Sequence, residues 1–248
     1  MGDVINLEER RAVRRPERDA LRLPGRRAIR GPDRDALRLP GRRAVRVPDR
    51  DTARAQVARS TRPTFFFDLA CPLSYLSAER VERMLGDVEW IPATLSATGP
   101  SRPLSHTSAK RAHAEALAIT MRIPLIWPDS FPSGCPRVMR AACHAVHSGD
   151  GARFALAAGR LAFCGGFDLE DPEILAEAAA AAGIQPESSL AAADDPAYDL
   201  ELQSTARRLR AADVLELPAI RAEGMWLGGE PAVEQALALR GNVRLGRG

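Results

Sequence analysis

The sequence predicts an α/β domain whose chain is interrupted by an all-helical insertion. Three observations support this prediction. Residues 63–103 open with a strand–helix–strand pattern, residues 104–211 carry helical patterns, and residues 212–248 return to two strands and a helix. Because the strand patterns lie on both sides of the helical segment, they are expected to form one sheet that the helices interrupt.

The opening unit follows from local signals in consecutive segments. Thr64–Ala70 (TFFFDLA) is a short apolar run and predicts a buried strand. Pro72 suits the first position of a helix, and Ser74–Leu85 places apolar side chains on one helical stripe that Gly86 ends. Val88–Leu95 predicts the next strand. A strand–helix–strand unit of about thirty residues is typical of a parallel crossover.

The rest of the body is predicted as five helices, followed by two strands and a final helix. Prolines between residues 124 and 136 indicate an extended connector inside the helical segment. Segment 171–182 has the strongest helix signals, with Asp at the N-cap, Pro at the first helical position and Gly after its end. We expect helices over 108–121, 137–146, 152–163, 171–182, 197–211 and 230–239, and strands over 214–222 and 225–227.

Residues 1–62 differ from the body in charge and in pattern. They hold 18 Arg and 9 acidic residues, whereas the rest of the chain holds 17 basic and 23 acidic residues. A 16-residue repeat reads RRAVRRPERDALRLPG at 10–25 and RRAIRGPDRDALRLPG at 26–41. We predict a disordered basic arm. Translated tandem DNA upstream of the true start, and an arm that binds nucleic acid or an anionic surface, are the alternatives.

Cys71 lies between a predicted strand end and a predicted helix start. Backbone N–H groups and the helix dipole favour a thiolate there, which predicts a pKa below the free value of about 8.5. The motif Cys71-Pro72-Leu73-Ser74 is C-x-x-S, so it cannot form a C-x-x-C disulfide. The Ser74 hydroxyl could instead donate a hydrogen bond to the sulfur. A structural cysteine that starts a helix by chance is the alternative.

A second candidate element is the segment Leu215–Ala219, which reads LELPA. Pro218 opens a predicted strand late in the chain, a position that is compatible with a cis peptide bond. An ordinary trans proline on an edge strand is the alternative. If the segment belongs to the Cys71 site, the sulfur should contact the Leu217–Pro218 peptide.

Several motifs occur in a fixed order over residues 63–240: FFFDLACPLSYL, a helical insertion, ELPAI and GMWLGGEPAVEQAL. This order resembles the DsbA-like thioredoxin superfamily, and most closely its branch of 2-hydroxychromene-2-carboxylate isomerases and kappa-class glutathione transferases. That branch typically opens with an aromatic strand, Asp and then Ser-Pro-x-x-Tyr-Leu. Asp68, Pro72, Tyr75 and Leu76 keep the pattern, and Cys71 replaces the serine.

The resemblance implies a thioredoxin-like fold in which a helix start faces a cis-proline loop. It implies catalytic roles for Cys71 and Ser74, and glutathione as a possible cofactor. The residues expected to bind that cofactor are Pro72, Leu217, Pro218 and Glu230. The substrate would be a small molecule, or a thiol or disulfide. Dimers are common in the resembling branch, so a homodimer is a further expectation.

Three functions remain open at this point. A monothiol disulfide oxidoreductase would use the Cys71 thiolate and an external thiol that resolves the mixed disulfide. A glutathione-dependent isomerase or transferase would use Cys71 only to orient the glutathione thiolate. A binding module would keep the fold without turnover. We favour the oxidoreductase, because the family serine is a cysteine here.

Composition limits the compartment and the partners. The chain has no apolar run of about 18 residues and no secretory signal, so we expect no membrane contact and a cytoplasmic location. The four cysteines are then expected as free thiols, without a structural metal. A nucleic-acid partner is not expected, because only the arm at 1–62 could bind one.

Other chemistry-bearing residues are assigned to structure. Cys143 and Cys164 are expected in the core, while Cys135, in the proline-rich connector, stays open as a resolving thiol. His144 and His147 are expected on a solvated or core-edge helix face. A solvated face is also expected for the three arginines of the last insertion helix, Arg207, Arg208 and Arg210, with binding of a substrate carboxylate as the alternative.

Overall fold

The computed structural model describes residues 62–95, 104–131 and 133–245. The predicted disordered arm lies outside these residues except for its last member, Arg62, which pairs with Asp87 at 2.8 Å. Within the described part no helix is both long enough and apolar enough to cross a bilayer.

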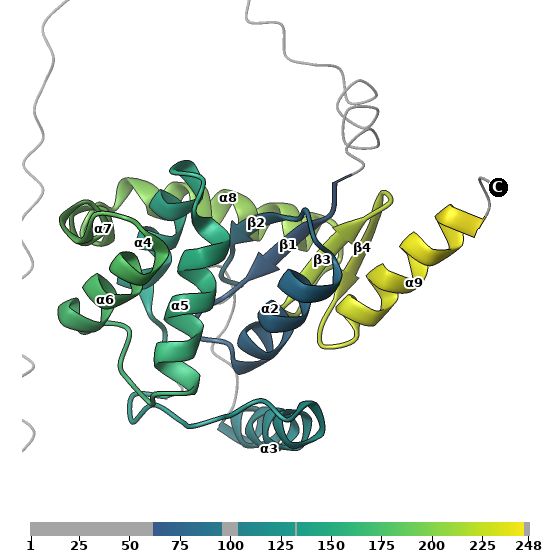
Figure 1. Ribbon diagram of the computed structural model, residues 1–248, viewed down its shortest axis with the longest axis horizontal. Coiled ribbons are helices and arrows are strands. Elements are labelled where there is room, and N and C mark those ends of the chain that lie inside the picture. The colour runs from purple at the N-terminus through teal and green to yellow at the C-terminus, as the bar shows by residue number, and fades with distance from the viewer. Residues whose placement is uncertain (1–61, 96–103, 132, 246–248) are drawn as a thin grey trace, which may run out of the picture. The chain divides into compact units, whose positions relative to one another are not determined.

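A four-stranded sheet forms the centre of the described body (Figure 1). Its spatial order is β2-β1-β3-β4; β1 pairs parallel with β2 and antiparallel with β3, and β4 pairs antiparallel with β3. The parallel pair confirms the crossover predicted for the opening unit. The strands are β1 Thr64–Phe67, β2 Glu89–Pro92, β3 Ala219–Ala222 and β4 Met225–Gly228.

The three phenylalanines of β1 are buried on both faces of the sheet. Successive side chains on a strand point to opposite faces. Phe65 and Phe67 lie in the main core with α2 (Pro72–Met84) and α9 (Ala232–Leu245), whereas Phe66 lies in a second cluster on the other face. A strand buried on both faces reads as a continuous apolar run, as TFFF does.

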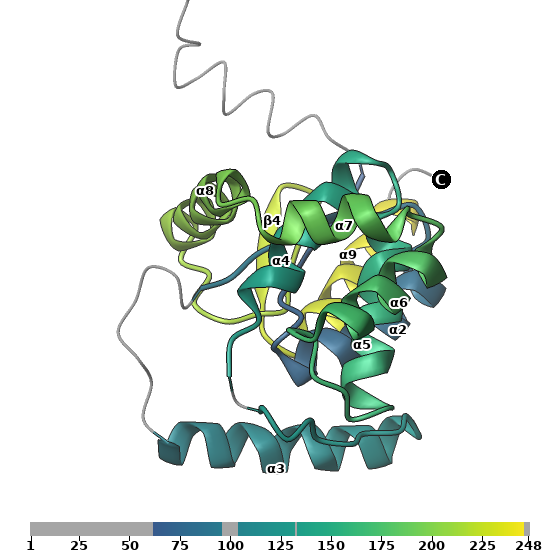
Figure 2. The ribbon, with the colours of Figure 1, turned by 90° about the vertical axis from the view of Figure 1, so that its left-hand side faces the viewer.

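In the described part of the chain, six helices lie between β2 and β3, and four of them pack together as a group (Figure 2). The group consists of α4 Pro136–His147, α5 Gly151–Phe163, α6 Pro172–Ala182 and α7 Pro186–Ala193. Alanines fill much of its interior, including Ala141, Ala145, Ala158 and Ala178, which are buried completely. These small side chains let the helices approach closely.

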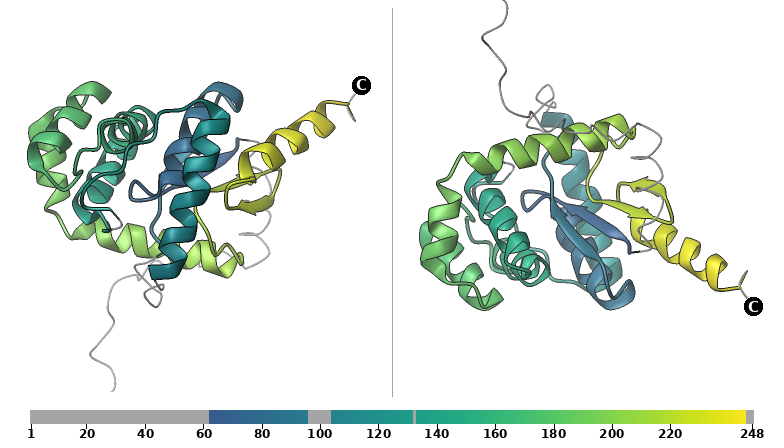
Figure 3. Two further views of the ribbon diagram at one scale, coloured as in Figure 1. Left: turned by 90° about the horizontal axis from the view of Figure 1, so that it is seen from below. Right: turned by 90° about the horizontal axis from the view of Figure 1, so that it is seen from above.

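In chain order, the other two insertion helices lie between this group and the strands that precede and follow it (Figure 3). Helix α3 (Leu104–Met121) packs on α2. Helix α8 (Ala197–Ala211) contacts α4, and its buried Leu209 joins the second cluster under Phe66. The α4 and α8 helices therefore flank the end of the sheet from which Cys71 follows.

Most predicted elements are confirmed, although several of their ends differ: β1 and β2 are shorter than predicted, and α3 begins at Leu104 instead of at residue 108. Helix α7 was not predicted, because Ser188 and Ser189 weaken a short helical pattern. The strand predicted from residue 214 begins only at Ala219, because Pro218 has no N–H for the ladder. The last helix begins at Ala232, after the Gly229–Pro231 turn, instead of at residue 230.

Candidate functional site

Cys71 is the N-cap residue of α2, as the strand–helix pattern predicts. The buried strand β1 fixes the entry of the chain, and the Cys71 N–H donates to the Asp68 carbonyl at 3.0 Å. The N–H of Ser74 and that of Tyr75 donate back to the Cys71 carbonyl at 3.0 and 3.2 Å. With Pro72 at the first helical position, this turn holds the cysteine at the start of the helix.

The Cys71 sulfur contacts the segment that the sequence singled out 146 residues later. Its thiol donates to the Leu217 carbonyl at 3.6 Å, and the Leu217–Pro218 peptide bond is cis. Leu217 itself is buried, so this contact lies at the inner side of the loop. The expected meeting of the helix start and the proline loop is confirmed.

Ser74 supports the turn and the sulfur together. It is only 3% exposed, and its Oγ accepts the Asp68 N–H at 3.2 Å. Both its N–H and its hydroxyl hydrogen-bond toward Cys71 in a way that lowers the pKa of the thiol. Ser74 therefore stands where a second cysteine would lie in C-x-x-C, and it acts on the sulfur without forming a disulfide.

The net pKa shift of Cys71 is opposite to the prediction. Burial raises the pKa of the thiol, and the nearby Asp68 charge raises it further. The Ser74 hydrogen bonds and the charge of Lys110 lower it, but they do not compensate. At neutral pH the free protein therefore holds Cys71 as a thiol, and deprotonation needs a base.

Asp68 is the acid beside this thiol. Burial raises the pKa of its carboxyl to about 6, although the Ala70 N–H (2.9 Å to Oδ1), the Thr94 side chain and the Lys110 charge all lower it. Above about pH 6 the group is ionised. The sequence showed Asp68 only as part of a motif, and its pKa depends on residues far from it in sequence.

Lys110 was missed by the sequence analysis. It lies on α3, it is half-buried, and its charge acts on both Asp68 and Cys71. One signal could have drawn attention to it, since it is the only lysine in a chain that otherwise uses arginine.

A cavity of about 390 Å³ opens beside Asp68, between the sheet end and helices α4 and α8. Its far wall carries the Arg140–Asp199 ion pair, in which two nitrogens each meet one carboxylate oxygen at 2.8 Å. The cavity has room for a small polar molecule. Its lining consists of Asp68, Ala70, Thr94, Gly134, Cys135, Pro136, Met139, Arg140, Asp199, Leu202 and Gln203.

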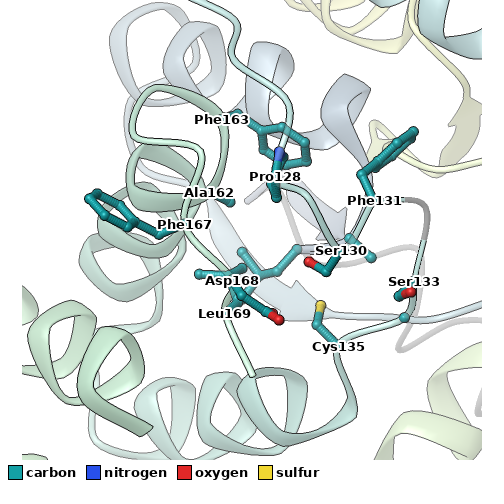
Figure 4. Close-up of a pocket in the computed structure, with 13 residues that line it drawn as sticks. Pro128, Ser130, Phe131, Ser133, Cys135, Ala162, Phe163, Phe167, Asp168 and Leu169 are labelled. Carbon is teal, nitrogen blue, oxygen red and sulfur yellow. The ribbon is translucent and has the colours of Figure 1, made fainter. Parts of the chain in front are cut away.

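A smaller cavity of about 30 Å³ lies on the other side of Cys135 (Figure 4). Phe131, Phe163 and Phe167 surround it, and the Cys135 sulfur is drawn at its lower edge. Its volume suits a water molecule better than a substrate.

The structure places only some of the residues predicted to bind glutathione close to the Cys71 sulfur. Leu217 and Pro218 lie at the sulfur, and Pro72 follows it on α2. Glu230 lies in the turn before α9 and is linked to this group through Gly229, whose N–H donates to the Pro218 carbonyl at 2.8 Å.

The predicted histidines and one arginine take part in contacts between elements. His144 Nδ1 lies 3.5 Å from the Tyr198 hydroxyl, and His147 Nε2 lies 3.1 Å from a Glu201 carboxylate oxygen, so both join α4 to α8. Arg210 donates to the Leu95 carbonyl at 2.7 Å. Among the described residues, no three His, Cys, Asp or Glu side chains gather as a metal site would require.

The other three cysteines differ in how deeply they are buried. Cys143 is completely buried in α4. Cys164 is half-buried at the end of α5, with its sulfur 2.8 Å from the Tyr75 hydroxyl. Cys135 is the N-cap residue of α4 and is 8% exposed.

Comparison with known proteins agrees with this architecture. A 2-hydroxychromene-2-carboxylate isomerase structure matches with a TM-score of 0.64 at 15% identity, covering 73% of this chain and 95% of the other. The cytosolic disulfide reductase DsbM from Pseudomonas aeruginosa matches with a TM-score of 0.55 at 15% identity, covering 74% and 98%. At these identities the likeness shows the fold.

No curated protein sequence matches the chain significantly. The family model described as DSBA-like thioredoxin domain matches residues 64–239, which span the sheet, the insertion helices and the Cys71 site. The chain therefore belongs to the DSBA-like thioredoxin domain family, and its fold is thioredoxin-like with a helical insertion.

Proposed function

We propose that this protein is a monothiol disulfide oxidoreductase whose nucleophile is Cys71. The observation that carries the proposal is the position of the Cys71 sulfur, 3.6 Å from the carbonyl that precedes cis-Pro218, with Ser74 at the fourth position of the motif. Cys71 is only partly buried, and a cysteine at a helix start with part of its surface in solvent can reach an external disulfide.

The reaction begins with a proton transfer. Because Cys71 rests as a thiol, a base must take its proton, and Asp68 is ionised above about pH 6. The Cys71 thiolate then attacks one sulfur of the substrate disulfide. The substrate S–S bond breaks, a mixed disulfide forms on Cys71, and the departing thiolate takes up a proton. A second thiol molecule then attacks the mixed disulfide and restores Cys71.

Glutathione is the reducing thiol that we propose. Two features support it: the C-x-x-S motif, whose single thiol has no cysteine partner within the motif, and a cavity beside Asp68 sized for a small polar molecule. The DsbM reductase, solved with glutathione, matches with a TM-score of 0.53 at 16% identity, covering 73% of this chain and 98% of the other. Pro72, Leu217, Pro218 and Glu230 are the proposed contacts.

A turnover assay tests the proposal. The full chain is given hydroxyethyl disulfide with glutathione as the reductant, and oxidised glutathione is measured. We expect Cys71→Ser to reduce turnover by about a thousandfold, because serine is far less nucleophilic than a thiolate. Cys164→Ser is the matched control and should keep the wild-type rate. Equal turnover by wild type and Cys71→Ser would overturn the proposal.

A second candidate is a glutathione-dependent isomerase, in which Cys71 orients the glutathione sulfur. The protonated state of Cys71 favours it, since a thiol can donate a hydrogen bond. Glutathione-dependent isomerisation of a 2-hydroxychromene-2-carboxylate that survives in Cys71→Ser would support this candidate. A chain that binds glutathione but turns over neither substrate would support the third alternative, a non-catalytic module.

A further inference from the structure

Cys135 has the same local setting as Cys71. Each is the N-cap residue of a helix, each is followed by proline at the first helical position, and neither side chain caps the backbone. Helix α4 begins at Cys135 as α2 begins at Cys71. The chain therefore contains two Cys-Pro helix starts, whose cysteines lie 64 positions apart in the sequence.

The first turn of α4 contacts the turn that connects β1 to α2. The Leu69 N–H points at the Met139 sulfur, 3.3 Å away, and Met139 is one turn into α4. Ala70, the residue before Cys71, lines both cavities that Cys135 lines. Cys135 thus lies near the residues that precede Cys71, and it lines the same cavity as Asp68 and Ala70.

Asp68 is the ionisable group that both cysteines share. Its charge raises the pKa of Cys71 and also that of Cys135, so it lies within electrostatic reach of both thiols. Cys135 is 8% exposed, and its own burial is the main reason for its raised pKa. A thiol in this position is protected from solvent reagents but open to a group that enters the cavity.

From this geometry we propose that Cys135 is the resolving thiol for the mixed disulfide on Cys71. The inference rests on the proposed function and changes only which thiol acts second. The Cys135 proton passes to Asp68, and the Cys135 sulfur attacks the Cys71 sulfur. The bond between Cys71 and the substrate sulfur breaks, the substrate leaves as a thiol, and a Cys71–Cys135 disulfide forms. Glutathione then reduces that disulfide and is itself oxidised.

Trapping of the mixed disulfide tests this assignment. The full chain is mixed with glutathione disulfide at neutral pH, quenched with acid at short times and analysed by peptide mass spectrometry. Wild type should accumulate a Cys71–Cys135 disulfide with little glutathione on Cys71. Cys135→Ala should accumulate at least about tenfold more glutathionylated Cys71, because the adduct has lost its internal resolving thiol.

Cys143→Ala provides the matched control, since Cys143 is a second buried cysteine of α4. It should behave as wild type. If wild type and Cys135→Ala accumulate equal amounts of Cys71–glutathione adduct, the resolving role is overturned while the proposed function stands. If Cys71 gains no adduct in either protein, the proposed function fails as well.

Folding is checked in the same samples. Cys135→Ser keeps a small polar side chain at the helix start, and circular dichroism shows whether the two variants fold as wild type does. The accumulated adduct must appear in Cys135→Ser too, because serine cannot resolve it. An adduct in the alanine variant alone would point to a packing defect and would contradict the assignment.

Discussion

Two helix starts in this protein are built from the same dipeptide and lead to different thiol environments. Cys71-Pro72 is half-buried and contacts the carbonyl before a cis-proline, whereas Cys135-Pro136 is buried at the wall of a cavity. The local sequence places a sulfur at the start of each helix. The tertiary surroundings decide which sulfur a disulfide can reach, and they raise the pKa of both thiols.

The Asp68 charge acts on both thiols, so replacing Asp68 should have a larger effect than replacing Asp171 or Lys110. We expect Asp68→Asn to slow the reaction of Cys71 with glutathione disulfide by about a hundredfold at neutral pH, since the base is lost. Stopped-flow mixing measures this rate. An increased rate would mean that the Asp68 charge only opposes the thiolate, and it would remove the proton-transfer step from the account.

Asp68→Asn should slow disulfide exchange but should make the folded protein more stable. A carboxyl whose pKa rises from 3.8 to about 6 on folding favours the folded state fully below pH 3.8 and loses that contribution as the pH rises through 6. The shift corresponds to about 3 kcal/mol. Asp68→Asn should therefore raise the free energy of unfolding at neutral pH by up to about 3 kcal/mol, measured by urea denaturation.

The pH dependence separates this effect from a general gain in packing. In wild type, stability should fall between about pH 4 and pH 6 while the rate of disulfide exchange rises. In Asp68→Asn both curves should lose the inflection near pH 6. A variant that is less stable than wild type at neutral pH would show that the buried carboxylate contributes favourable contacts instead.

Helix α6 provides the reference for a helix start that serves stability alone. The Asp171 carboxylate accepts the Glu173 N–H at 2.8 Å, a cap that neither cysteine makes. Asp171→Ala should lower the free energy of unfolding by about 1 kcal/mol. Asp171→Asn retains a capping oxygen and is the control. Equal stability of all three proteins would mean that caps contribute little to the insertion helices.

Lys110 should give the smallest effect. Its charge lowers the pKa of Asp68 and of Cys71, so Lys110→Met should move the inflection of the rate profile upward by less than about one pH unit. Lys110→Arg keeps the charge and should leave the profile in place. A downward shift in Lys110→Met would contradict the assigned direction.

The sequence was sufficient to predict the elements whose signals are local. Helix α8 was predicted with its observed ends at Ala197 and Ala211, and α6 with its capping Asp171 and its final Gly183. The contact between Cys71 and Leu217 was also predictable, because the motif order indicated which distant segment faces the helix start.

The environment of the site was less predictable, because it depends on groups that meet only in the folded chain. The local helix start predicts a lower pKa for Cys71, but burial and the Asp68 charge raise it. The cavity is lined by residues of α4, α8 and the sheet end that are far apart in sequence, and Met139 of α4 contacts Leu69 across a similar separation. A short stretch of sequence cannot predict these contacts, because they join residues that are far apart in the chain.

The central claim is that Cys71 is the sulfur that attacks disulfides. The most direct measurement exposes the full chain briefly to one equivalent of glutathione disulfide and maps every cysteine by mass spectrometry. The account predicts that the first adducts, or the disulfide formed from them, contain Cys71, and that Cys71→Ser leaves Cys135, Cys143 and Cys164 unmodified. Equal modification of another cysteine in Cys71→Ser, or a wild-type Cys71 that stays free, would contradict it.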